Sequence, residues 1–211
     1  MAALSIAERD RRRFPARREM VSEGDAIRKP RAILSGWAYQ QRILTDGRRH
    51  ILNFLMPGDL IGFCDHRTPA GSSSIVAVTE VVTCAVPDAE AGSDLAEAYA
   101  LSVALDRHYL VQHAIRLGRL TAQERLIDWM LETQGRLMLA GLVSGDDFTT
   151  PLTQELLADA LGLTNVHVNR TLQVLRRQGL LSLHGGAISL TDRALLRSMV
   201  DYRPSRLIPT H

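Results

Sequence analysis

Two short helical patterns separated by a glycine constrain this chain more than any other feature of its sequence. They occupy the segment TQELLADALGLTNVHVNRTLQVLRRQG, which runs from residue 153 to residue 179. Thr153 and Thr164 are suitable N-caps for the two helices, and Gly162 can end the first helix in a left-handed conformation. The predicted buried faces contain Leu156, Leu157, Ala160 and Leu161 in the first helix and Val168, Leu172 and Leu175 in the second. The segment therefore predicts two tightly connected helices.

The spacing of three residues is typical of a helix-turn-helix. Such a motif needs a small residue where its helices touch, a residue that accepts positive φ in the turn, and an apolar residue that anchors the second helix. Ala158, Gly162 and Val168 meet these needs in that order. An ordinary αα-hairpin inside a helical core is the alternative that this pattern leaves open.

The outward face of the second helix carries side chains that can bind DNA. Amide and guanidinium groups form paired hydrogen bonds with adenine and guanine edges in the major groove, which the start of this helix would enter. The predicted base-reading residues are Asn165, Val166, Asn169, Arg170 and Gln173, and the predicted phosphate-binding residues are Thr153, Thr164, His167, Arg176 and Arg177. Exposed asparagine and arginine also occur on many solvated helices, so these residues alone would indicate little.

The sequence after this motif supports the same interpretation. GLLSLHGGAISLTD contains two short apolar runs around Gly185 and Gly186, which predict a hairpin that would form a wing beside the motif. From residue 151 onward there are seven arginines and four acidic residues, whereas the whole chain has a formal net charge of +2. Positive charge is therefore concentrated where a polyanion would bind.

The N-terminal half has the pattern of a small antiparallel β-roll. Between residues 20 and 94, glycine-containing turns separate runs such as WAYQQRIL, HILNFLM and SIVAVTEVVTCAV. LTDGRRHI predicts a hairpin, because Asp-Gly supports the positive φ angles of a tight turn. Residues 1–19 are expected to be a basic, solvated and partly disordered leader, with a nucleic-acid-binding arm as the alternative.

Residues 95–120 contain a helical pattern that is apolar on two faces. One face can pack on the roll, and the other can pack on the same helix of a second chain, which is the simplest route to a symmetric dimer. The predicted dimer-helix residues are Leu101, Leu105, His108, Gln112 and Ile115. A second helix is expected over residues 121–140, and residues 121–211 are expected to form a winged helix-turn-helix domain.

The composition argues against several protein classes. Cys64 and Cys84 are too few for a disulfide framework, a four-cysteine iron–sulfur cluster or a paired-CxxC zinc site. The sequence has no secretory h-region and no uncharged stretch long enough for a membrane span. These features favour a cytoplasmic protein with no membrane partner.

Several longer motifs resemble the Crp/Fnr superfamily of bacterial transcription regulators. They are REMVSEGDAI, ILSGWAYQQRILTDGRRHILNFLMPGDLIGF, RLGRLTAQERLIDWMLE and LGLTNVHVNRTLQVLRRQGLL. The resemblance implies an α+β fold: an N-terminal antiparallel β-roll of the cyclic-nucleotide-binding, jelly-roll type, a long dimerisation helix and a C-terminal winged helix-turn-helix. It also implies a homodimer that recognises an inverted repeat in double-stranded DNA, contacts RNA polymerase if it is an activator, and is not an enzyme.

This sequence matches the family pattern at one base-reading position and differs from it at another. Family members commonly contact DNA with an arginine at the place of Arg170, which this sequence keeps. Where many members have a glutamate that accepts from cytosine, this sequence has Val166, which can make only apolar contacts. We expect a half-site different from that of the best-known members, with Asn165 and Asn169 as the residues that alter specificity.

The sensor segment departs further from the members that bind cyclic nucleotides. In FCDHRTPAGSSSIVAV, Phe63 stands where the ribose-binding glutamate is expected, and residues 72–74 are serines where the phosphate-binding arginine should be. Without that acceptor and that cation, binding of cyclic AMP is not supported. The residues predicted to line an effector pocket are Gly62, Phe63, Arg67, Ser73 and Ser74.

No cofactor and no metal site are predicted. Cys64 and His66 are close in sequence and could bind haem or respond to oxidants, although such residues are more often structural. Cupin-type enzymes also use β-rolls, but they need clustered histidines, a spacing that is not shown by His50, His66, His108 and His113. The alternatives that remain are a regulator with an unknown small-molecule effector and a ligand-free constitutive regulator whose roll is only a scaffold.

Overall fold

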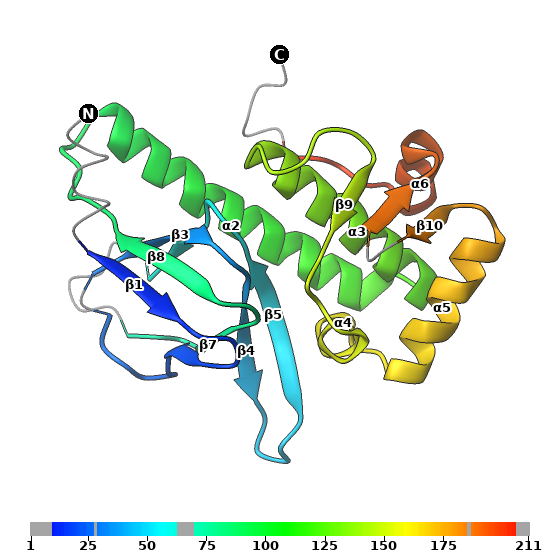
Figure 1. Ribbon diagram of the computed structural model, residues 1–211, viewed down its shortest axis with the longest axis horizontal. Coiled ribbons are helices and arrows are strands. Elements are labelled where there is room, and N and C mark those ends of the chain that lie inside the picture. Colours follow the sequence, from blue (N-terminus) through cyan, green and yellow to red (C-terminus); the bar gives the residue numbers. More distant parts are fainter. Residues whose placement is uncertain (1–9, 28, 63–69, 185–186, 206–211) are drawn as a thin grey trace. The chain divides into compact units, whose positions relative to one another are not determined.

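The computed structural model describes residues 10–27, 29–62, 70–184 and 187–205 (Figure 1). The chain divides into two compact units, Met1–Leu110 and Val111–His211, and helix α2 (Asp94–Arg119) continues from the first into the second. Within the described residues, no helix is long and apolar enough to cross a bilayer. Each unit has its own buried core.

The first unit is the predicted antiparallel β-roll and contains two four-stranded sheets. Their strand orders are β1-β8-β3-β6 and β2-β7-β4-β5. The strands are β1 (Arg11–Phe14), β2 (Glu19–Val21), β3 (Arg31–Ser35), β4 (Ala38–Ile43), β5 (Arg49–Leu55), β6 (Leu60–Ile61), β7 (Ser74–Ala77) and β8 (Val81–Ala85). Inward side chains from both sheets form one core, which includes Ile33, Leu55, Ile75 and Val81.

The predicted Asp-Gly hairpin is confirmed and joins β4 to β5 (Figure 1). Gly47 has φ 84° in its turn, and the Leu44 amide donates to the Arg48 carbonyl oxygen at 2.8 Å. A second glycine is required by close packing between strands. A Cβ atom on Gly36 would lie 2.0 Å from the carbonyl oxygen of Glu80, so a side chain there would displace backbone.

One expectation about the N-terminus is wrong. Residues 11–14 of the predicted leader form β1, which pairs with β8 from Arg11↔Cys84 to Phe14↔Val81. The three arginines of β1 are exposed, whereas Phe14 packs against the roll core. Charged side chains suit an edge strand because they discourage pairing with other chains. The same run of charge led to the wrong prediction of a solvated segment here. The prediction for residues 1–9 lies outside the described residues.

The second unit combines helices with a three-stranded sheet of order β10-β11-β9. Its further elements are α3 (Ala122–Leu139), β9 (Asp147–Thr149), α4 (Gln154–Leu161), α5 (Asn165–Arg177), β10 (Leu181–His184), β11 (Ala187–Leu190) and α6 (Arg193–Val200). α3 packs against α4, α5 and α6, and Leu126, Leu161, Val168 and Leu175 are fully buried. The predicted helix-turn-helix is α4 with α5. The predicted wing is the β10–β11 hairpin, whose tip at residues 185–186 lies outside the described residues.

A capping box separates α2 from α3, close to the predicted boundary at residue 121. The Thr121 amide donates to the Glu124 carboxylate at 2.7 Å, and the Glu124 amide donates to the Thr121 hydroxyl at 3.4 Å. Both bonds satisfy amides that a helix start otherwise leaves without an internal partner. The sequence therefore stops α2 and starts α3 within three residues.

Candidate DNA interface and sensor pocket

The turn between α4 and α5 depends on two threonine caps and one glycine. Thr153 Oγ1 accepts from the Leu156 amide and Thr164 Oγ1 accepts from the His167 amide, both at 3.2 Å. Gly162 ends α4 with φ 62° and ψ 39°, the left-handed conformation that glycine adopts without steric cost. In both caps the hydroxyl is the acceptor, so its proton can still be donated to a phosphate oxygen.

The inner face of α5 anchors the helix in the second unit. Val168 and Leu175 are fully buried, as predicted, and Leu172 is half-buried. Thr171 is also buried, which the sequence analysis missed. Its hydroxyl donates to the His167 carbonyl oxygen at 2.8 Å, so the polar atom is satisfied within the helix. Its position three residues after Val168 is the signal that could have identified it.

The outer face of α5 is open to solvent. Every predicted base-reading residue and every predicted phosphate-binding residue is exposed. Val166, the apolar residue at the start of the helix, is 78% exposed. A single exposed valine is common on protein surfaces, but this one lies in the first turn of α5 beside exposed polar residues. That position suits contact with a thymine methyl group.

Three side-chain amides form a chain across the candidate interface. Gln173 Nε2 donates to Asn169 Oδ1 at 2.8 Å, and Asn169 Nδ2 donates to Gln154 Oε1 at 3.2 Å. Gln154 begins α4 and was not predicted to belong to this surface, although it directly follows the Thr153 cap. The hydrogen bonds orient Asn169 between two partners before any DNA binds.

The electrostatics of the motif favour a polyanion. α5 carries Arg170, Arg176 and Arg177 and contains no acidic residue. The N-termini of α4 and α5 also carry partial positive charge and backbone amides that can bind phosphate. Arg176 and Arg177 lie in the last turn of α5, at the opposite end of the helix from Val166, and exposed arginines there suit contact with phosphates.

One arginine that the sequence analysis missed joins three chain segments in the second unit. Arg125 of α3 donates to the carbonyl oxygens of Leu117, Leu120 and Leu161, each at 2.9 Å. These carbonyls belong to the last turn of α2, the α2–α3 connection and the end of α4. Arg125 therefore satisfies carbonyl groups at two helix ends and holds α4 against the end of α2.

A second missed feature is a buried ionic cluster between the end of α2 and α3. Arg116 donates to Asp128 and to Glu132, both at 2.6 Å, and Arg136 lies 3.7 Å from Glu132. All four side chains are buried. Burial raises the pKa of Asp128, and the charge of Arg116 opposes that rise. The cluster fixes the orientation of α3 relative to the last turns of α2.

The first unit contains a cavity of about 620 Å³, which we call the sensor pocket. Its apolar lining residues include Val21, Ile27, Leu55, Leu60, Ile61, Ile75 and Leu110, and its polar ones include Gln40, Asn53, Ser73, Asp106 and Arg107. Gln40 Nε2 donates to Ser73 Oγ at 2.5 Å. Among the described lining residues, Asp106 and Arg107 are the ionisable ones, and their charges cancel.

The predicted pocket residues have different outcomes. Gly62 and Ser73 line the sensor pocket. Ser74 is not a lining residue, and its hydroxyl instead accepts from the Glu23 amide at 3.2 Å. Phe63 and Arg67 lie outside the described residues, as do Cys64 and His66. Among the described residues, no group of three or more histidine, cysteine or acidic side chains is arranged to hold a metal ion.

α2 carries an exposed apolar stripe, whose residues differ from most of those predicted for the dimer helix. Val103, Leu110, Val111 and Ile115 are 42–56% exposed. Of the predicted set, Ile115 belongs to this stripe, whereas Leu101, Leu105, His108 and Gln112 are half-buried. The stripe has helical spacing, so its members lie along one side of α2.

Both units match known protein families. Residues 11–94 match the cyclic nucleotide-binding domain, and residues 124–199 match the Crp-like helix-turn-helix domain. The nitrogen fixation regulation protein FixK of Azorhizobium caulinodans is 32% identical over 192 residues, which cover 88% of this chain and 77% of that protein. The transcriptional activator protein FnrL of Cereibacter sphaeroides is 28% identical, covering 88% of this chain and 78% of that protein.

A solved structure supports the same relationship. FixK2 from Bradyrhizobium japonicum superposes with a TM-score of 0.78 at 26% sequence identity, covering 92% of this chain and 98% of that one. The superposition therefore extends over most of both chains.

Proposed function

The chain belongs to the Crp/Fnr family of transcription regulators, and we propose that it binds an inverted-repeat operator in double-stranded DNA as a homodimer. It is a regulator and not an enzyme. The observation that carries the proposal is the outer face of α5, where all the predicted base-reading residues are exposed. Thr153 and Thr164 cap the starts of α4 and α5, and the base-reading residues follow the second cap. This arrangement matches the geometry by which a recognition helix enters a major groove.

Sequence recognition depends on the start of α5 in this proposal. Arg170 binds a guanine edge through two guanidinium hydrogen bonds, Asn169 binds adenine or a water-bridged base, and Val166 contacts a thymine methyl. Arg176, Arg177 and the threonine caps bind phosphates and set the register of the helix. Val166 cannot accept a hydrogen bond from cytosine, so the base pair that it faces is not selected through such an acceptor.

Dimerisation depends on α2. The exposed stripe of Val103, Leu110, Val111 and Ile115 gives each chain an apolar surface that an identical stripe can cover. Pairing along a two-fold axis places two recognition helices on successive major grooves, about 34–36 Å apart. Arg125 and Arg116 then carry any movement of the α2 end to α3 and α4, because they bond these elements directly.

The sensor pocket is the proposed effector site. Its lining is mostly apolar, and its paired Asp106 and Arg107 leave no excess positive charge among the described residues. This lining supports a largely neutral, partly apolar effector rather than a cyclic phosphate. The effector would act by binding the DNA-competent and DNA-incompetent arrangements with different affinity. The second candidate is a constitutive regulator that has no effector. In either case we propose that the protein acts in the cytoplasm, and that it contacts RNA polymerase if it is an activator.

Selection of random duplex DNA by the purified chain, without added effector, tests this function. We expect an enriched inverted repeat with half-sites about one helical turn apart. Arg170→Ala should relax one symmetric pair of positions in the enriched sequence, and Arg13→Ala is the matched control on the roll. Enrichment of a single half-site would contradict the dimer. A failure to enrich any sequence at low salt, with the dimer intact, would contradict ligand-free recognition.

A further inference from the structure

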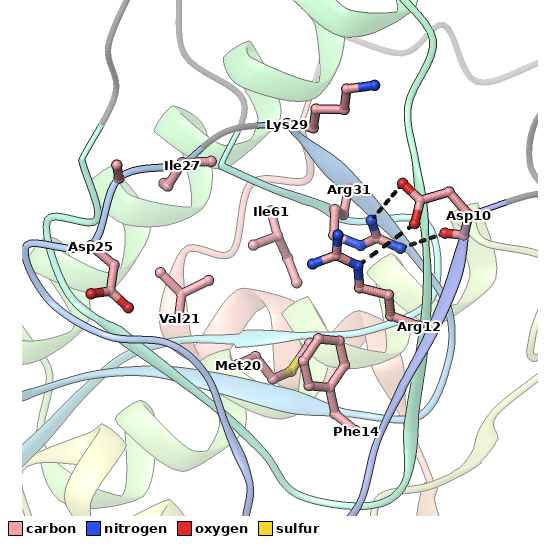
Figure 2. Close-up of a pocket in the computed structure, with 11 residues that line it drawn as sticks. Asp10, Arg12, Phe14, Met20, Val21, Asp25, Ile27, Lys29, Arg31 and Ile61 are labelled. Carbon is pink, nitrogen blue, oxygen red and sulfur yellow. Dashed lines mark hydrogen bonds and ion pairs between the residues drawn. The ribbon is translucent and has the colours of Figure 1, made fainter.

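The roll contains a second cavity, of about 450 Å³, which is distinct from the sensor pocket. Its lining residues come from β1, β2, β3 and β6, from Asp10 and from the segment between β2 and β3 (Figure 2). The larger apolar residues of its lining are Phe14, Met20, Val21, Ile27 and Ile61. A cavity of this size and lining can enclose a small organic molecule.

One end of this cavity is strongly basic. Arg12, Lys29 and Arg31 line that end together with one acidic residue, Asp10, whereas Asp25 lies at the other end (Figure 2). The side chain of Arg31 is only 11% exposed, so its charge is poorly hydrated. Three cations and one carboxylate leave an excess of positive charge at the end of an apolar cavity.

Arg31, which lines the cavity, is held in place by hydrogen bonds to Thr83 and Asp10. Its Nε donates to Thr83 Oγ1 at 2.8 Å, and its Nη2 donates to the Thr83 carbonyl oxygen at 3.3 Å and to the Asp10 carbonyl oxygen. Its Nη1 donates to the Asp10 carboxylate at 3.2 Å, and the same carboxylate lies 3.6 Å from Arg12 Nε. The Asp10 carboxylate therefore lies between two guanidinium groups.

Asp10 marks the place where a carboxylate is favoured. The hydrogen bond from Arg31 lowers the pKa of Asp10, as does the positive charge of Arg31, Arg12 and Lys29. The Asp10 side chain is 41% exposed, so it can move aside without leaving a buried charge. An incoming carboxylate could take its place and extend its apolar part over Phe14 and Ile61.

We propose that this basic cavity is a binding site for a small amphipathic carboxylate, whose head group pairs with Arg12 and Arg31 and whose apolar tail lies on Phe14, Met20 and Ile61. Arg31 supplies a buried donor, Arg12 supplies an exposed one, and Asp10 is the internal competitor. The site shares Val21, Ile27 and Ile61 with the sensor pocket, so these three side chains form the wall between the two cavities. A test must therefore tell one cavity from the other.

Octanoate is a suitable probe, with acetate and octan-1-ol as comparators that keep only the head group or only the tail. Binding is followed by two-dimensional NMR titration of the full chain, with dissociation constants taken from the amide shifts. Asp10→Asn should strengthen octanoate binding about fivefold, because it removes the competing charge, and Arg12→Gln should weaken it about fivefold. The amide spectrum of Asp10→Asn shows whether the variant stays folded, so a gain in affinity with an otherwise unchanged spectrum is assigned to the cavity.

The neighbouring strand residue provides a matched control. Arg13 follows Arg12 on β1, does not line the cavity, and pairs with Glu80 at 3.3 Å. Arg13→Gln should leave octanoate binding within twofold of the parent, as should Arg107→Gln in the sensor pocket. Loss of binding in Arg107→Gln but not in Arg12→Gln would assign the probe to the sensor pocket and overturn the proposal. Equal effects of Arg12→Gln and Arg13→Gln, or equal binding of octan-1-ol, would also overturn it.

Discussion

Arg125 Nη1 donates a hydrogen bond to the carbonyl oxygen of Leu161, the last residue of α4, at 2.9 Å. The same guanidinium donates to the end of α2 through Leu117. The DNA-binding motif and the end of the long helix are thus joined by one side chain. A cation near helix C-termini is also stabilised by their dipoles.

Arg125→Ala should destabilise the protein by about 2–3 kcal/mol, because it leaves three carbonyl groups without their charged donor. Arg125→Lys should recover only part of this loss, since a single ammonium cannot reach all three acceptors in the same geometry. Urea unfolding measures both values. The exposed Arg119, in the last turn of α2, provides the control variant Arg119→Ala. Equal stability of Arg125→Ala and Arg119→Ala would show that the joint is unimportant for the fold.

Arg116→Met should cost about 3–5 kcal/mol, because it leaves the buried Asp128 and Glu132 without their main cation. An acid whose pKa is raised in the folded state binds protons more readily in the folded chain than in the unfolded one. The free energy of unfolding therefore falls as pH rises. The loss in Arg116→Met should therefore be larger at pH 8 than at pH 5. Adding Asp128→Asn and Glu132→Gln should recover part of it. No recovery in the triple variant would mean that lost packing, and not uncompensated charge, causes the effect.

Arg170→Ala should weaken operator binding by about 1–3 kcal/mol and relax specificity at one base position per half-site. Arg177→Ala should weaken binding to operator and random DNA alike and reduce the salt slope, because a phosphate contact is lost. Fluorescence anisotropy at several salt concentrations separates the two effects. If Arg170→Ala changed only the salt slope, the base-reading role of this residue would be wrong.

Ile115→Glu should break the proposed dimer, because it places a charge in the apolar seam that the α2 stripe would form. We expect the dimer dissociation constant to rise about 100-fold or more, together with a loss of operator binding. Leu195→Glu is the matched control, since Leu195 on α6 is 46% exposed and Ile115 is 47% exposed. Analytical ultracentrifugation reports the dissociation constants. A dimer that tolerates Ile115→Glu as well as Leu195→Glu would exclude the α2 stripe as the seam.

The stability that Glu124 contributes should be lost at acid pH. Hydrogen bonds from the Thr121 backbone amide and hydroxyl lower the pKa of Glu124 below its ordinary value of 4.5. Between the lowered pKa of the folded state and 4.5, the unfolded chain binds more protons than the folded one. The contribution of Glu124 is therefore present above pH 4.5 and is lost as pH falls through the folded pKa. Glu124→Gln should flatten the acid side of the stability profile. Glu19→Gln, on an exposed strand position, should leave it unchanged.

The helix-turn-helix was predictable because its rules are local. Thr153, Thr164 and Gly162 act on backbone groups within a few residues of themselves, and the burial of Val168 and Leu175 follows from helical spacing. The Asp-Gly hairpin was predictable for the same reason. β1 was missed because its three arginines suggest solvent, whereas strand formation there depends on pairing with β8, which lies about seventy residues later in the chain.

The amino-acid pattern alone was sufficient for the order of the elements, the family resemblance and the exposed face of α5, since each depends on residues close together in the chain. Tertiary structure decided which distant groups meet. The Arg125 bonds to Leu117 and Leu161, the Arg116 cluster, and the pairing of Arg31 with Asp10 and Thr83 join residues 8 to 52 positions apart. No local rule gives such contacts, because they depend on how the helices and sheets pack, and that packing also places the two cavities on either side of Val21, Ile27 and Ile61.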